Sequence, residues 1–125
     1  MSGETPKRYT LRVSPRARQE LEAHLQHILE VAGEETGRAW YDGMLAAIGT
    51  LSENPRRRAV IPEQDRFRTE IRQISYRRTP HGPAWRVLFT ITEGSEDAPT
   101  VNLLHIRHGA QKPITCTEAR KIEGR

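Results

Sequence analysis

The sequence of 125 residues contains a single cysteine, Cys116, so the chain cannot close a disulfide within itself. Its longest uninterrupted apolar run is only a few residues, far short of the ~18 that a transmembrane helix needs. The first residues, 1–6, hold no apolar stretch of signal-peptide length. We therefore expect a protein of the reducing cytoplasm that does not contact a membrane.

The sequence also lacks the patterns of common cofactor and metal sites. It has no glycine-rich phosphate loop and no dinucleotide-binding fingerprint. His24 and His27 stand three residues apart, a spacing that can share a metal, but no neighbouring carboxylate or cysteine completes a convincing ligand set. Cys116 has no evident base beside it, which argues against a catalytic thiol. We expect neither a metal nor a cofactor.

Charged side chains are what the sequence has in abundance. Hydrophobic residues make up 35% and charged residues 29%, and 20 basic against 16 acidic side chains give a net charge of +4. Residues 56–78 alone contain eight arginines and three acidic residues. Two interpretations are open for this stretch: a solvated face, or a surface that meets phosphates or an acidic protein segment.

The first half of the chain predicts one strand and two helices. Tyr9–Val13 alternates apolar and polar side chains, which is typical of a strand, and Ser14-Pro15 is a good helix start. The apolar stripe of the first helix, which Gly33 ends, comprises Leu21, Leu25, Ile28, Leu29 and Ala32. The stripe of the second helix, which Asn54-Pro55 ends, comprises Trp40, Met44, Ile48 and Leu51. Two amphipathic helices joined by a short turn predict an antiparallel helical hairpin.

The second half predicts three strands. They span Glu70–Arg78, Trp85–Ile91 and Val101–His108, with turns over residues 79–83 and 93–99. The expected fold is thus α+β with the order β-α-α-β-β-β, in a single domain over residues 1–114 that begins with a polar lead-in over residues 1–8.

Residues 115–125 are a polar, weakly patterned tail. It ends in Ile122–Arg125, which spells a protease recognition sequence often engineered into expression vectors. We therefore leave these last residues out of functional reasoning.

Four segments in this order resemble one family. They are the opening strand with its proline start (residues 9–17), the end of the second helix (residues 48–55), the aromatic-Arg-apolar strand (residues 85–89) and the last strand with its glycine (residues 103–110). The chain is similar here to the RelE/ParE superfamily of toxins from type II toxin–antitoxin systems. The resemblance implies a helical hairpin packed on a small twisted antiparallel sheet.

The same resemblance implies a partner and two possible activities. Such toxins are held inactive by a cognate antitoxin in a hetero-oligomeric complex. RelE-like members are metal-independent endoribonucleases that cut mRNA on the ribosome, whereas ParE-like members poison DNA gyrase without hydrolysis. Fold alone does not choose between them.

Two residues, Arg86 and His108, match positions used by the RNA-cleaving members, and Arg107 beside His108 is the third candidate catalytic residue. Arg86 would stabilise charge on the scissile phosphate and His108 would act as general acid, with Arg107 in support. The alternatives are a structural Arg86 that pairs with an acid such as Glu70, and a strand-end His108 bonded to a loop. Neighbouring residues of a regular strand face opposite sides of the sheet, so Arg107 and His108 share a groove only if the strand bulges or ends at Gly109.

The chain departs from the RNA-cleaving pattern after His108. Gly109 stands where an arginine is common, and no tyrosine or histidine follows. These departures favour the ParE-like activity. The endoribonuclease remains the alternative, and a third possibility is a degenerate member that only binds its antitoxin and regulates its operon.

The candidate residues for binding the antitoxin or the target lie mostly in the arginine-rich stretch. They are Arg56, Arg57, Arg58, Arg68, Arg72, Arg77 and Trp40. Trp40 also fits the apolar periodicity of its helix, so core packing is its alternative role.

Overall fold

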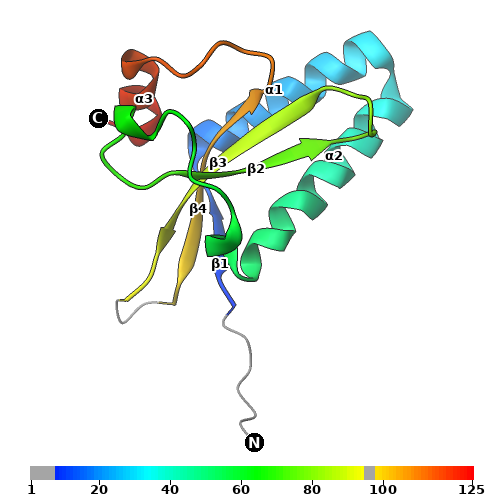
Figure 1. The fold of residues 1–125 in the computed structure, drawn as a ribbon. Coiled ribbons are helices and arrows are strands. Elements are labelled where there is room, and N and C mark those ends of the chain that lie inside the picture. Colours follow the sequence, from blue (N-terminus) through cyan, green and yellow to red (C-terminus); the bar gives the residue numbers. More distant parts are fainter. Residues whose placement is uncertain (1–7, 95–97) are drawn as a thin grey trace, which may run out of the picture.

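The computed structural model describes residues 8–94 and 98–125, and Figure 1 shows its arrangement. The regular elements are β1 (Thr10–Val13), α1 (Pro15–Ala32), α2 (Glu34–Gly49), β2 (Arg72–Arg77), β3 (Ala84–Thr92), β4 (Thr100–His108) and α3 (Cys116–Glu123). Short 3₁₀ turns at Thr50–Ser52, Pro55–Arg57 and Gln64–Arg66 join α2 to β2. The predicted α+β order is confirmed, with α3 added. Most of the predicted polar lead-in (1–7) and the middle of the predicted turn after β3 (95–97) lie outside the described residues.

The helical hairpin forms where its caps and its apolar stripes predict it. The Ser14 hydroxyl accepts a hydrogen bond from the backbone N–H of Ala17 at 3.0 Å, which caps α1. Gly33, with φ of 91°, ends α1 and begins α2. A Cβ on Gly37 would lie 2.4 Å from the Leu29 side chain, so the glycine lets the two helices approach closely. No helix among the described residues is both long and apolar enough to span a membrane.

The sheet is mixed, which corrects the expectation of a wholly antiparallel one. Its strand order is β1-β4-β3-β2, and β4, β3 and β2 pair antiparallel. β1 pairs with β4 in parallel, from Thr10 opposite Thr100 to Val13 opposite Leu103. Since β2, β3 and β4 alternate in direction, β4 runs in the same direction as β1 and pairs with it in parallel. A bulge at Leu104 interrupts the β3–β4 register between Leu88 and Phe89.

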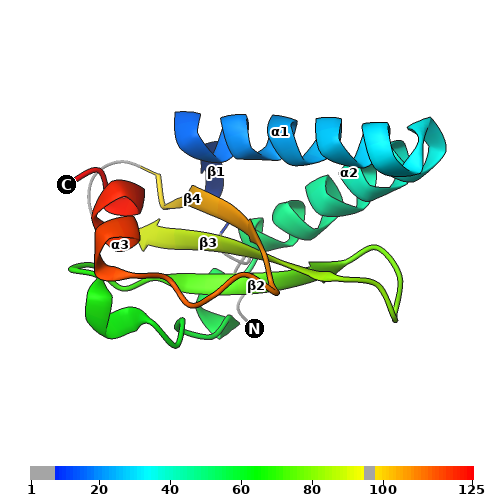
Figure 2. The same cartoon turned by 90° about the horizontal axis from the view of Figure 1, so that it is seen from above.

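Each face of the sheet carries its own apolar cluster. On the face covered by α1 and α2, Trp40 and Met44 pack against Trp85 and Phe89. Leu88 points to the opposite face, where a second cluster includes Ile61, Phe67, Ile71, Ile114, Ala119 and Ile122. Figure 2 shows the hairpin along one face of the sheet and α3 at the end remote from the hairpin tip.

Helix α3 is an ordered helix that packs against the rest of the fold, whereas the sequence analysis described its residues as a polar tail. Thr115 and Glu118 form a reciprocal capping box at its start. The Glu123 carboxylate accepts hydrogen bonds from the backbone N–H groups of Arg68 and Thr69 at 3.0–3.1 Å. The helix has only eight residues, of which Ala119 and Ile122 are buried, and Ile122 belongs to the final residues that the sequence analysis left out.

Candidate functional site

Arg86, the first candidate catalytic residue, is held in a bidentate ion pair with Glu63. It lies on β3, and its Nη1 and Nη2 donate to the two Glu63 carboxylate oxygens at 2.9 and 2.7 Å. Its Nε donates to Gln73 Oε1 at 2.7 Å. The Arg86 side chain is 14% exposed and the Glu63 side chain 7%. All three nitrogens of the guanidinium are therefore occupied by acceptors from the protein itself.

Glu63 is the residue that orders this site. The hydrogen bonds from Arg86 lower the pKa of Glu63 from an ordinary 4.5 to about 2, and the backbone N–H of Ile114 adds to the effect while burial opposes it. The carboxylate consequently stays ionised at physiological pH. The sequence analysis expected a structural partner such as Glu70, but Glu70 pairs with Arg72 at 2.9 Å instead.

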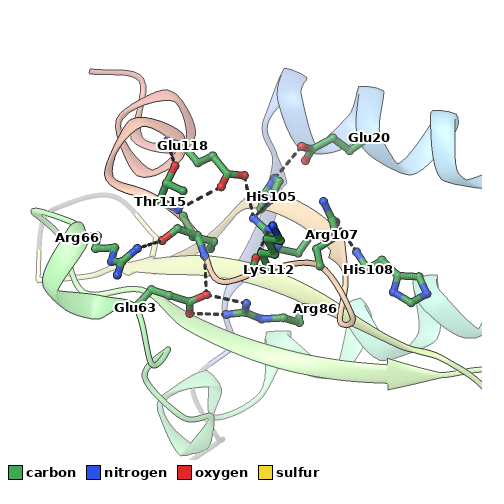
Figure 3. A network of polar contacts seen from close by, with 12 residues as sticks. Glu20, Glu63, Arg66, Arg86, His105, Arg107, His108, Lys112, Thr115 and Glu118 are labelled. Atoms are coloured by element: carbon green, nitrogen blue, oxygen red, sulfur yellow. Dashed lines mark hydrogen bonds and ion pairs between the residues drawn. The ribbon is translucent and has the colours of Figure 1, made fainter.

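Arg107 lies opposite Arg86 in the β3–β4 register and is also committed to internal contacts. It is 2% exposed. Its Nη2 donates to the Lys112 carbonyl at 2.8 Å, and its Nη1 lies 3.3 Å from Glu118 and 3.4 Å from His105 Nε2. Figure 3 shows these contacts beside the Arg86–Glu63 pair. The two guanidinium groups share one face of the sheet, and each is hydrogen-bonded to protein acceptors, although the buried Nε of Arg107 has none among the described residues.

His105 forms a buried link that the sequence analysis did not identify. Because Arg107 only donates, His105 Nε2 accepts and its Nδ1–H donates to Glu20 Oε2, at 2.7 Å. β1 pairs with β4 only as far as Leu103, so the edge of β4 beyond that point has no strand neighbour. Side chains of α1 take over this role: Glu20 accepts from the Ile106 N–H at 3.0 Å, and His24 Nε2 donates to the Ile106 carbonyl at 3.1 Å.

His108 lies on the other face of the sheet from Arg86 and Arg107. Its ring packs edge-on against Trp85 with centroids 4.9 Å apart, and its Nδ1 accepts from the Ala110 N–H at 3.0 Å. The bulge at Leu104 comes before this pair of residues and leaves their alternation intact. The structure thus does not bring the three candidate nuclease residues into one cleft; Figure 3 shows the His108 ring directed away from the Arg86–Glu63 pair.

The two histidines considered for metal binding have no ligand set around them. Within residues 8–94 and 98–125, no group of three or more His, Cys, Asp or Glu side chains could hold an ion. His24 packs instead against Trp85 with ring centroids 4.6 Å apart. Burial lowers the pKa of His24 below its ordinary 6.5, so the imidazole is neutral at physiological pH.

The candidate binding arginines spread along β2 and its preceding loop. Arg56 pairs with Glu93 at 2.5 Å, and Arg58 donates to Thr50 at 3.1 Å. The exposed side chains of Arg57 and Arg77 have no acidic partner among the described residues, and Arg77 donates to the Gly82 carbonyl. Arg68 lies at the far side, next to α3. These arginines therefore do not converge on a single concave patch.

Trp40 is a core residue, which corrects its inclusion among the binding candidates. It is 2% exposed, and its ring lies 5.2 Å from that of Trp85 and 6.5 Å from that of Tyr76, all edge-on. The Tyr76 hydroxyl donates to the Trp40 carbonyl at 3.0 Å. This side chain presents almost no surface to a partner, and the alternative role given by its periodicity is the one found.

Comparison with known proteins places the chain in a family. The model of the ParE toxin of type II toxin–antitoxin systems (parDE) matches residues 11–113. The chain belongs to the ParE toxin family. Among solved structures, a chain of the chromosomal ParDE toxin–antitoxin system from P. aeruginosa is similar, with 16% identity, a TM-score of 0.58, and coverage of 80% of this chain and 95% of that one. At that identity the likeness shows the fold alone. No curated protein matches the sequence.

The match to the ParE family stops before the last helix. Residues 11–113 include β1 to β4 and both arginines of the closed site. Glu118, which contacts Arg107, lies beyond the matched range on α3. In this ParE-family toxin, one side of the Arg107 environment is therefore supplied by an element outside the matched residues.

Proposed function

We propose that this type II toxin stops growth by binding DNA gyrase, without cutting RNA, and that a cognate antitoxin neutralises it in a hetero-oligomeric complex in the cytoplasm. Membership of the ParE family supports the class of activity. The single observation that carries the proposal is the paired state of Arg86, whose three guanidinium nitrogens each donate to Glu63 or Gln73.

Metal-free RNA cleavage needs a guanidinium that is free to bind the phosphate in the transition state. Breaking a buried pair by taking away one partner costs about 3–5 kcal/mol. To bind a phosphate with the N–H groups that now pair with Glu63, Arg86 would have to break that ion pair. Arg107 would likewise have to give up its contacts with Lys112 and Glu118. His108, the proton donor in such a scheme, faces the other side of the sheet. These features favour binding over hydrolysis.

A binding toxin needs cationic side chains that are free to meet an acidic target surface. Arg57, Arg77 and Arg78 are exposed and have no acidic partner among the described residues. Charged groups of this kind steer association and set its dependence on salt. We therefore assign them to target contact in this proposal, ahead of the paired Arg56 and Arg72.

The direct test is inhibition of DNA supercoiling by purified gyrase on a relaxed plasmid. The toxin should inhibit supercoiling, and addition of the antitoxin encoded beside it should restore the reaction. Arg57→Glu and Arg77→Glu should each weaken inhibition about fivefold or more. Arg120→Glu, an exposed arginine of α3 outside the family match, is the control and should be neutral. Unimpaired supercoiling at all toxin concentrations contradicts the proposal.

A further inference from the structure

An apolar groove lies between the tip of the helical hairpin and the turn that joins β2 to β3. Its volume is about 220 Å³. Ile28, Val31 and Thr36 line it from the helices, and Thr79 and Pro83 line it from the turn. Trp40 and Trp85 complete its floor. Figure 2 shows this turn below the hairpin tip, at the end of the molecule opposite α3.

Val31 makes this groove unusual for a solvent-facing surface. It is 68% exposed, against 43% for Leu45 and 40% for Val60, the other exposed large hydrophobic residues of the described chain. A scattered exposed valine needs no explanation, but one at the edge of an apolar concavity is typical of a contact site. The groove therefore offers burial of apolar surface to a partner side chain.

One side of the groove carries a positive charge. Arg78 is the one charged residue in its lining; it is exposed, and no acidic side chain among the described residues pairs with it. The neighbouring Arg77 donates to the carbonyl of Gly82, which also lines the groove. On the helical side, Glu34 is already paired with Arg38 at 3.2 Å. The turn side is thus cationic and unneutralised.

The C-terminal segment of the chain lies too far away to fill the groove. Arg125 contacts Glu123 at 2.7 Å and the Arg66 carbonyl at 3.2 Å, beside α3. Figure 1 shows the C-terminus on the far side of the molecule from the hairpin tip. The described C-terminal residues therefore do not occupy the groove.

We propose that the groove receives an apolar side chain from the antitoxin, and that a carboxylate next to it in the antitoxin sequence pairs with Arg78. This inference rests on the neutralisation proposed above and adds the place and chemistry of one contact. An apolar side chain would pack against the apolar walls of the groove while a neighbouring carboxylate pairs with Arg78 at its edge. Nucleic acid could pair with Arg78 but would not bury the apolar walls.

The test is binding of the purified antitoxin, encoded beside the toxin gene, to toxin variants. Val31→Asp should raise Kd at least tenfold and Arg78→Glu at least fivefold. The matched controls are Leu45→Asp, at an exposed apolar helix position outside the groove, and Arg38→Glu, at an exposed arginine outside it; both should stay within twofold of the unsubstituted toxin. Thermal melting checks that Val31→Asp is folded, which we expect because the Val31 side chain is so exposed.

Fluorescence gives a second, direct readout. Both tryptophans of the chain lie buried beneath the groove, so antitoxin binding should change their environment and shift the tryptophan emission. An antitoxin that contains tryptophan is used with those residues replaced by phenylalanine.

The outcomes separate the two proposals. If the unsubstituted toxin does not bind the antitoxin, neutralisation and the groove contact both fail. If binding is intact but Val31→Asp weakens it no more than Leu45→Asp does, the groove contact alone is wrong. A dimer of the toxin by itself that Val31→Asp dissociates would assign the groove to a second copy and overturn the proposal.

Discussion

The ion pair between Glu63 and Arg86 makes a measurable prediction about stability and pH. A folded-state pKa of about 2 against an ordinary 4.5 for Glu63 corresponds to roughly 3 kcal/mol of folding stability at neutral pH. The Arg86 side chain is 14% exposed, so water screens part of the attraction, and we expect about 2 kcal/mol. Glu63→Gln should lower the free energy of unfolding by at least this amount at pH 7.

The sign of the pH dependence follows from the lowered pKa. The unfolded chain binds a proton at Glu63 near pH 4.5, whereas the folded chain does so only near pH 2. The stabilisation by the ion pair is therefore complete above about pH 5.5 and is lost as the pH falls toward 2. The difference in unfolding free energy between the native chain and Glu63→Gln should shrink by about 1–1.5 kcal/mol between pH 6 and pH 3.

Urea unfolding followed by circular dichroism at pH 7, 6, 5, 4 and 3 measures this difference. Asp65→Asn is the control, because Asp65 is an exposed carboxylate two residues away that pairs with no cation in the described part of the chain. Adding Arg86→Met to Glu63→Gln should cost less than the sum of the single changes, since it removes the unpaired buried charge. Parallel pH curves for the native chain and Glu63→Gln would refute the reasoning.

Three further changes test other parts of the fold by thermal or urea unfolding. Gly43→Ala should destabilise the fold by about 1–3 kcal/mol, because a Cβ at this position would lie 2.1 Å from the Tyr76 hydroxyl. Gly49→Ala is the control and should be neutral or stabilising, because no atom lies within 4 Å of the added Cβ. Equal effects of the two changes would contradict this reasoning. Ile122→Ala should lower the free energy of unfolding by about 2–4 kcal/mol, since Ile122 is 5% exposed and packs α3 against the sheet. A change under about 0.5 kcal/mol, the size of a surface effect, would mean that α3 is not packed there. Because burial lowers the pKa of His24 below 6.5, the folded state loses stability as the pH falls through 6.5, and His24→Gln should flatten that loss; an unchanged slope between pH 7.5 and 5.5 would count against a buried neutral imidazole.

The helical hairpin was predictable because its information is local. Caps and apolar spacing for α1 and α2 stand in the sequence itself, and the alternation of Arg107 and His108 to opposite faces follows from strand geometry. The parallel pairing of β1 with β4 depends on residues about 90 positions apart, for which no local pattern exists.

The partners of the candidate site residues could not be predicted from the sequence. Glu63 lies in an irregular loop and reaches Arg86 only through the tertiary fold. Glu20 reaches His105 across 85 positions because β1 stops short and leaves the edge of β4 to α1. The resemblance identified Arg86, and the missing arginine after His108 drew attention to Arg107. The ion pair and the hydrogen bonds that hold these two side chains are a property of the folded chain.

The account depends most on the claim that the two arginines stabilise the fold and do not act on RNA. Primer extension on mRNA in a reconstituted translation reaction, run beside the supercoiling assay with the same toxin preparation, tests it directly. We predict uncut mRNA together with inhibited gyrase. Ribosomal cuts in the mRNA that disappear in a folded Arg86→Lys variant would contradict it.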